Sequence, residues 1–238
     1  EEHRHISTQE YNQLRVLPLN TSNFKRPINY DGMAPYFRNE LTKKVREGIE
    51  VKLLFDSWGT SLPRSFFEEF QKLGGELRYF SRLKVAFDLF TKNHKRNHRK
   101  LLIIDEKITY LGSANIAEYS LNWREMVLRI EGKLGSCFVE SFKESYRKHQ
   151  RTVFNMTDYP NVLSYHDYEI VQDVPSIIRQ QIKTRFEQLI TEAKTSVYIE
   201  TPYFLPGHRL RKVLMEAGGR GVDVKVIVPK HSDVRLVD

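Results

Sequence analysis

One short stretch of the chain combines side chains that suit chemistry on a phosphodiester. His98, Lys100 and Asn115 supply a titratable base, a fixed cation and an amide donor. An imidazole is uncharged over much of the physiological pH range, so it can attack phosphorus without first losing a proton. The pattern H-x-K-x4-D-x6-G-S-x-N therefore predicts a site that acts on phosphodiesters.

A strand must position the first two of these side chains. Residues two apart share a face of a strand, so His98 and Lys100 are expected to point into one cavity while Arg99 points elsewhere. The apolar run at residues 101–104 then buries the strand and anchors the polar pair on packed structure.

A returning strand is expected to complete the site. Asp105 begins the turn of a hairpin, and residues 108–111 form its second strand. This strand delivers Gly112, Ser113 and Asn115 back near the imidazole. Glycine allows a close backbone approach, and the hydroxyl and the amide can hydrogen-bond a phosphate oxygen.

Each residue of the pattern also has an ordinary explanation. A histidine among lysines and arginines is usually part of a solvated basic face. Asn115 alone would more often cap a helix. The joint spacing favours a site at His98, whereas the nearby His94 lacks the apolar run and the carboxylate, which indicates a basic loop.

These residues resemble the motif of the phospholipase D superfamily, and the segments around them resemble its bacterial cardiolipin synthase branch. The resemblance covers most of the chain from Tyr30 to Asp238. The segments that carry it lie at residues 51–60, 97–105, 122–125, 201–206 and 220–229, followed by Ser232 and Asp233.

The resemblance implies a mechanism that proceeds without a metal or another cofactor, through a covalent phosphohistidine. It also implies that Glu125, on a following strand, orients the histidine ring, while Asp105 closes the hairpin. The candidate catalytic residues are His98, Lys100, Asp105, Asn115 and Glu125. The candidate substrate-binding residues are Gly112, Ser113 and Tyr203, the last because ligand sites gather at the carboxyl ends of strands in open sheets.

Two segments of the chain also resemble each other. Residues 48–55 match residues 221–228 at a fixed offset (221 − 48 = 173), each as a helix end followed by a strand. Many α/β proteins contain similar pairs, which is the ordinary alternative. We therefore expect a first repeat at 1–160 that carries the motif, and at 161–238 the beginning of a second repeat that lacks it.

The family builds one active site from two such motifs, so this chain is expected to supply one half-site. Neither His208 nor His231 is followed by lysine two residues on. A second motif is expected near position 271 (98 + 173), in a region beyond Asp238. A homodimer that pairs two single motifs is less favoured, because residues 177–238 already begin a second copy.

The order of elements predicts an α/β protein with a layered, mixed sheet flanked by helices, in the phospholipase D-like fold. Hydrophobic periodicity predicts helices at 33–47, 65–73, 138–149, 177–193 and 209–217. It predicts further strands at 51–55, 77–80, 126–130, 196–200 and 222–228. Residues 83–97 are expected to form a basic, aromatic loop and residues 152–165 a linker, whereas residues 1–29 lack the helix and strand that the resemblance places there.

The amino-acid composition favours certain classes of binding partner but does not distinguish among them. The net charge of +8 favours anionic partners, either phospholipid headgroups or nucleic acid. The single Cys137 excludes an internal disulfide, and no run of about 18 apolar residues is present to span a membrane. Because Glu1 is not a natural start, we expect an upstream region, in which membrane helices of the family would lie.

Three functions are consistent with these residues. The main hypothesis is a phosphatidyl transferase of the cardiolipin synthase type, which acts on phosphatidylglycerol at the surface of a bacterial membrane. A hydrolase of the same superfamily, either a lipase or a nuclease, would use water in place of the lipid alcohol. A module that binds anionic lipid or nucleic acid without catalysis is the third.

Overall fold

The computed structural model describes residues 13–17, 33–57, 62–80, 97–117, 123–147, 162–173 and 180–230. The chain divides into two compact units, residues 1–159 with 165–168 and residues 160–164 with 169–238. The division between the two expected repeats at residue 160 stays a prediction. None of the helices in the described ranges is both long enough and apolar enough to cross a membrane.

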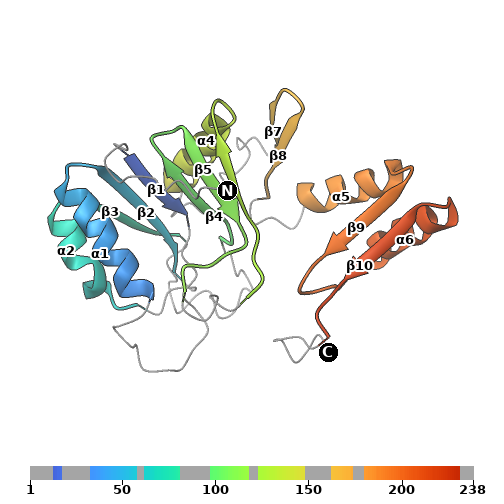
Figure 1. Cartoon of the computed structure of the whole chain (residues 1–238), viewed down its shortest axis with the longest axis horizontal. Coiled ribbons are helices and arrows are strands. Elements are labelled where there is room, and N and C mark those ends of the chain that lie inside the picture. The colour runs from blue at the N-terminus through green and yellow to red at the C-terminus, as the bar shows by residue number, and fades with distance from the viewer. Residues whose placement is uncertain are drawn as a thin grey trace, which may run out of the picture. The chain divides into compact units, whose positions relative to one another are not determined.

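The first unit is built on a six-stranded mixed sheet of order β3-β2-β1-β4-β5-β6 (Figure 1). Its strands are β1 Gln13–Leu17, β2 Glu50–Asp56, β3 Glu76–Phe80, β4 Lys100–Ile104, β5 Ile108–Gly112 and β6 Val127–Glu131. Strand β1 pairs parallel with β2, and β2 pairs parallel with β3. Strands β4, β5 and β6 continue the sheet in antiparallel pairs. The layered mixed sheet predicted from the sequence is therefore confirmed.

Helices cover the sheet, and apolar side chains between helices and sheet form the core of the first unit. Helix α1 (Met33–Arg46) lies beside helix α2 (Glu68–Lys72) (Figure 1), and the 3₁₀ turn η2 (Arg64–Phe67) leads directly into α2. They bury an apolar cluster of Leu41, Val51, Leu53, Phe55, Phe66, Phe67 and Phe70. Helix α4 (Gly135–Arg147) packs against β4 and β5 and buries Phe138, Phe142 and Tyr146, as their helical spacing predicted.

The second unit contains a parallel pair of strands with two helices. Strands β9 (Ser196–Glu200) and β10 (Asp223–Ile227) pair in parallel, and the helices are α5 (Gln181–Glu192) and α6 (His208–Gly219). Its buried core consists of Ile190, Ala217 and Val222. Each of these elements overlaps the helix or strand that periodicity predicted.

The end of α1 and the end of α6 have the same backbone geometry. Gly48 and Gly221 both have positive φ, 84° and 86°. Each glycine donates its N–H to the carbonyl three residues earlier, and the following residue donates to the carbonyl five residues earlier. This is the Schellman arrangement, in which a left-handed glycine ends a helix. The self-similarity seen in the sequence therefore corresponds to two matching helix-to-strand junctions.

Strand β1 lies where the sequence did not predict a strand. The offset of 173 projects the counterpart of β9 onto residues 23–27, but the strand runs from Gln13 to Leu17. Its separation from β9 is 183 residues (196 − 13). The connection between β1 and α1 has 15 residues (18–32) and that between β9 and α6 has 7 (201–207), so the first is eight residues longer. The added length shifts the strand out of the repeat register, which explains the poor match of residues 1–29.

The linker expected at residues 152–165 is partly wrong. Strand β7 (Val162–Tyr165) pairs with β8 (Tyr168–Val171) in a two-stranded sheet. His166 begins the turn between them with φ of 48°. Branched and aromatic residues on both sides of a two-residue turn favour a hairpin over a linker. The basic loop expected at 83–97, apart from Asn97, lies outside the described residues, as does His231.

Candidate active site

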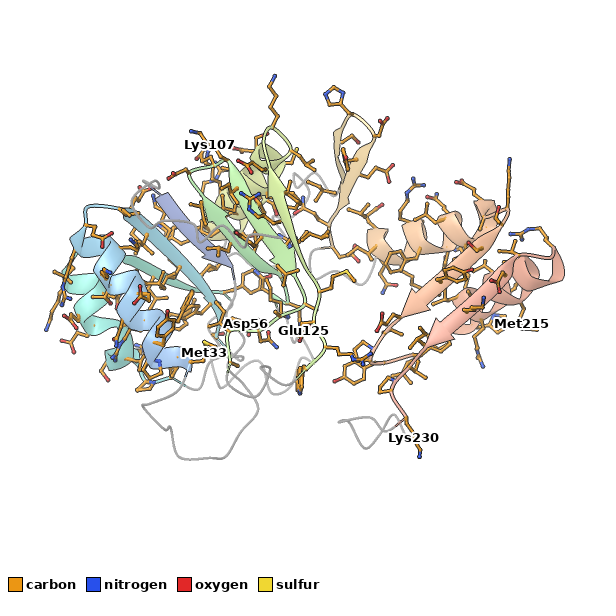
Figure 2. The ribbon with its side chains drawn as sticks, viewed as in Figure 1. Met33, Asp56, Lys107, Glu125, Met215 and Lys230 are labelled. Carbon is orange, nitrogen blue, oxygen red and sulfur yellow. The ribbon has the colours of Figure 1, made fainter. Side chains whose placement is uncertain are left out.

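Strand directions bring the ends of four segments to one edge of the sheet. Because β1, β2 and β3 are parallel and β4 is antiparallel to β1, β4 begins at the edge where the first three strands end. By the same rule β5 ends there and β6 begins there. Asp56, His98, Ser113 and Glu125 therefore share this edge. Figure 2 shows Asp56 and Glu125 at one end of the sheet and Lys107 at the other.

The start of β4 shows the alternation that the sequence predicted. The Arg99 guanidinium donates to the hydroxyls of Ser141 and Ser145 on α4, at 3.3 and 3.0 Å. Arg99 therefore points toward α4. Lys100 is partly buried, and its Nζ donates to the backbone carbonyl of His98 at 2.8 Å, while His98 itself is exposed.

The segment after β5 contacts the segment before β6. Gly112 lies opposite Lys100 on one side and Val127 on the other. Beyond it, the Ser113 hydroxyl donates to the Glu125 carboxylate, and the Ser113 N–H donates to the Met126 carbonyl at 3.2 Å. Ser113 thus holds the carboxylate that was expected to orient the histidine ring. The sequence did not indicate this pairing, because neither side chain identifies a partner 12 residues away.

Two other candidates lie at opposite ends of the hairpin. Asn115 follows β5 at the site edge, and its Oδ1 atom is inaccessible to solvent. Asp105 lies in the turn, where Asp105 and Glu106 have φ of 52° and 58° and Lys107 N–H donates to the Ile104 carbonyl at 3.0 Å. At about 3.3 Å per residue, Asp105 is roughly 17 Å along the strand from Lys100. Asp105 therefore closes the hairpin and is too far away to act on phosphorus at His98.

Tyr203, the third substrate-binding candidate, belongs to the second unit. It follows β9 and is 42% exposed. Its backbone is held by Thr201, whose Oγ1 donates to the Tyr203 carbonyl at 3.0 Å and accepts from its N–H at 3.3 Å. Its role in binding substrate stays a prediction.

Two opposing effects act on the pKa of Lys100, burial and nearby negative charge. Burial lowers the pKa of its ammonium, while the carboxylates of Glu125 and Asp56 act in the opposite direction. The net effect is a pKa below the usual value for lysine. Lys100 therefore loses its charge at a lower pH than a surface lysine does.

We expect this lowered pKa to limit activity at alkaline pH. Activity that needs the cation is present below the pKa of Lys100 and is lost as pH rises through it. Lys100→Arg should move the alkaline limb of the kcat profile to higher pH, since guanidinium stays charged. Lys52→Arg, at a partly buried lysine of β2, is the control and should leave the limb in place. If the alkaline limb of the Lys100→Arg profile stayed in place, the loss of activity at high pH could not be assigned to Lys100.

Asp56 was not recognised as a site residue from the sequence. It ends β2, is 2% exposed, and its Oδ2 accepts the backbone N–H of Asn97 at 2.7 Å. The available signal was a carboxylate at the carboxyl end of an otherwise buried strand, which is the edge where ligand sites gather.

The fold and the arrangement of motif residues at one sheet edge define a phospholipase D-like domain. Residues 30–149 and 186–238 match the family described as cardiolipin synthase, PLD-like domain. The chain belongs to this family.

Individual relatives agree with this assignment. A cardiolipin synthase of Listeria welshimeri is 35% identical over 212 residues, which cover 83% of this chain and 43% of the relative. A cardiolipin synthase of Clostridium perfringens is 33% identical over 216 residues, covering 83% and 45%. The chain thus spans less than half the length of these curated relatives. A phosphatidylserine synthase of Haemophilus influenzae has a similar fold, with a TM-score of 0.59 at 12% identity over 92% of this chain and 56% of that one.

Proposed function

We propose that this chain supplies one catalytic half of a phosphatidyl transferase of the cardiolipin synthase type. The observation that carries the proposal is the meeting of His98, Lys100 and Glu125 at one sheet edge in a member of this family. For the transfer, His98 supplies the nucleophile, Lys100 the cation, and Glu125 the acceptor for the ring N–H.

The reaction proceeds in two displacements at phosphorus. A ring nitrogen of His98 forms a bond to the phosphorus of phosphatidylglycerol, and the bond from phosphorus to the terminal glycerol oxygen breaks. The leaving glycerol takes a proton from the second half-site. The hydroxyl of another phosphatidylglycerol then attacks the phosphorus of the phosphohistidine and gives its proton to the second half-site. The bond from phosphorus to the His98 nitrogen breaks, which releases His98 and leaves cardiolipin as product.

The remaining residues stabilise charge and orientation. Lys100 and Asn115 donate to the non-bridging oxygens as charge develops there. Ser113 fixes the carboxylate of Glu125, which orients the His98 ring. No group of three histidine, cysteine, aspartate or glutamate side chains suited to a metal occurs among the residues that the structure describes. Metal-independent transfer stays a prediction.

The proposed partners are anionic phospholipid at a bacterial membrane surface and a second half-site of the same kind. The net charge of +8 favours approach to such a surface. The second half-site supplies the proton for the leaving alcohol, and we place it in the same polypeptide rather than in a homodimer partner.

The products formed from phosphatidylglycerol vesicles test this proposal. We expect the protein made from its complete gene to convert phosphatidylglycerol to cardiolipin and glycerol in equal amounts, measured by lipid chromatography and glycerol assay. Phosphatidic acid with glycerol would instead identify a hydrolase, because water would have replaced the lipid alcohol. Binding to the vesicles without any product would support a non-catalytic module.

A further inference from the structure

A buried carboxylate holds the backbone immediately before His98. Asp56 lies at the end of β2, and its Oδ2 accepts the N–H of Asn97, which is 41 residues away in sequence, at 2.7 Å. Asp56 is 2% exposed and Asn97 is 8% exposed. A hydrogen bond from a backbone N–H to a buried carboxylate is charge-assisted and stronger than one between neutral groups.

The backbone on the other side of His98 is held as well. The Asn97 side-chain oxygen accepts the N–H of Arg99 at 3.2 Å, and Lys100 Nζ donates to the carbonyl of His98 at 2.8 Å. His98 therefore has an exposed side chain on a backbone that is fixed before, at and after it. Asp56 anchors this arrangement to a different strand of the sheet.

We propose that Asp56 is a positioning residue, which sets the direction of His98 by fixing the backbone at Asn97. This inference rests on the proposed nucleophilic role of His98. It assigns to this carboxylate a function that is exerted through the main chain, by way of the Asn97 N–H.

The charge of Asp56 has a second effect at the site. Glu125 and Asp56 both raise the pKa of Lys100 against the effect of burial. Among the described residues, the groups that act on Lys100 are these two carboxylates and His98, whose carbonyl accepts from the ammonium. Removing the charge of Asp56 therefore lets the ammonium deprotonate at a lower pH.

Two substitutions separate the hydrogen bond from the charge. Asp56→Asn keeps an oxygen acceptor for the Asn97 N–H and removes the charge, whereas Asp56→Leu removes both and keeps the branched shape of the side chain. We expect kcat to fall about 100-fold for Asp56→Leu, the cost of a small misplacement of a reacting group, with KM little changed. Asp56→Asn should have an intermediate kcat and an alkaline limb shifted to lower pH.

The control and the second readout use the same protein, made from its complete gene and assayed on phosphatidylglycerol vesicles. Glu50→Gln removes an exposed carboxylate at the other end of β2 and should change neither kcat nor the pH profile. Thermal unfolding identifies any variant that fails to fold. If Asp56→Leu does not fold, the Asp56→Asn profile decides the question.

The outcomes distinguish this inference from the proposed function. The role of Asp56 would be overturned if Asp56→Asn had the wild-type kcat and an unshifted alkaline limb. It would also be overturned if Asp56→Leu folded and had the wild-type kcat. Neither result would affect the role of His98 as nucleophile. Full activity in a His98 variant would overturn the proposed function itself. A loss confined to KM would assign Asp56 to substrate binding and would also contradict positioning.

Discussion

Replacing His98 with asparagine is expected to lower kcat by about 10⁵-fold, the scale on which enzymes lose activity with their nucleophile. Asparagine can still donate a hydrogen bond but forms no stable bond to phosphorus. The measurement is the rate of cardiolipin formation from phosphatidylglycerol carrying radioactive phosphorus. A rapid quench should find the label on His98 of the wild-type protein and none on the variant.

A matched substitution distinguishes catalysis from general damage. His166 is exposed in the turn between β7 and β8 and has positive φ, which asparagine tolerates well. His166→Asn should therefore retain wild-type rate and stability. Label trapped on a residue other than His98, or full turnover in His98→Asn, would exclude His98 as the nucleophile.

Gly112→Ala is expected to damage both stability and activity. A Cβ at this position would lie 2.4 Å from the Met126 carbonyl oxygen and 2.9 Å from the Val127 Cα. Both are backbone atoms, so β6 must move away from β5. We expect a loss of about 3 kcal/mol, at the upper end for overpacking, and a Tm lower by roughly 10 °C. The same movement displaces Glu125 from Ser113, so kcat should fall in the protein that remains folded.

A glycine in open space provides the comparison. Gly218 lies on α6, and a Cβ added there would have no neighbouring atom within 4 Å. Gly218→Ala should raise stability by about 0.5–1 kcal/mol, because alanine loses less backbone freedom in a helix. Calorimetry checks both variants, and equal Tm values for Gly112→Ala and the wild type would show that β5 and β6 separate without cost.

The local structure of the site was predictable because its signals lie close together in sequence. Alternation at His98, Arg99 and Lys100 placed Arg99 on the face opposite the lysine, and the structure has it bonded to α4. The apolar run of β4 and the turn at Asp105 predicted the hairpin. Periodicity also located the helices that cover the sheet, since each buries an apolar stripe.

Other features depend on contacts between distant segments. Asp56 and Asn97 are 41 residues apart, and no local pattern links a strand end to the residue before the motif. The pairing of Ser113 with Glu125 depends on the register of β5 and β6. Strand β1 was missed because the offset of 173 was applied to it unchanged. The connection from β1 to α1 differs in length from the connection from β9 to α6, so the offset does not hold there.

The longer connection between β1 and α1 has a consequence for where the domain can vary. Strand β1 ends at the edge of its sheet where β4 begins, whereas the glycine-ended junction at Gly48 lies at the opposite edge, where β2 begins. A change in the length of the connection after β1 therefore leaves the join between helix α1 and strand β2 undisturbed. Changes in the length of this connection therefore begin at the rim of the domain that holds the motif residues, while the opposite rim keeps the junction that supports the scaffold.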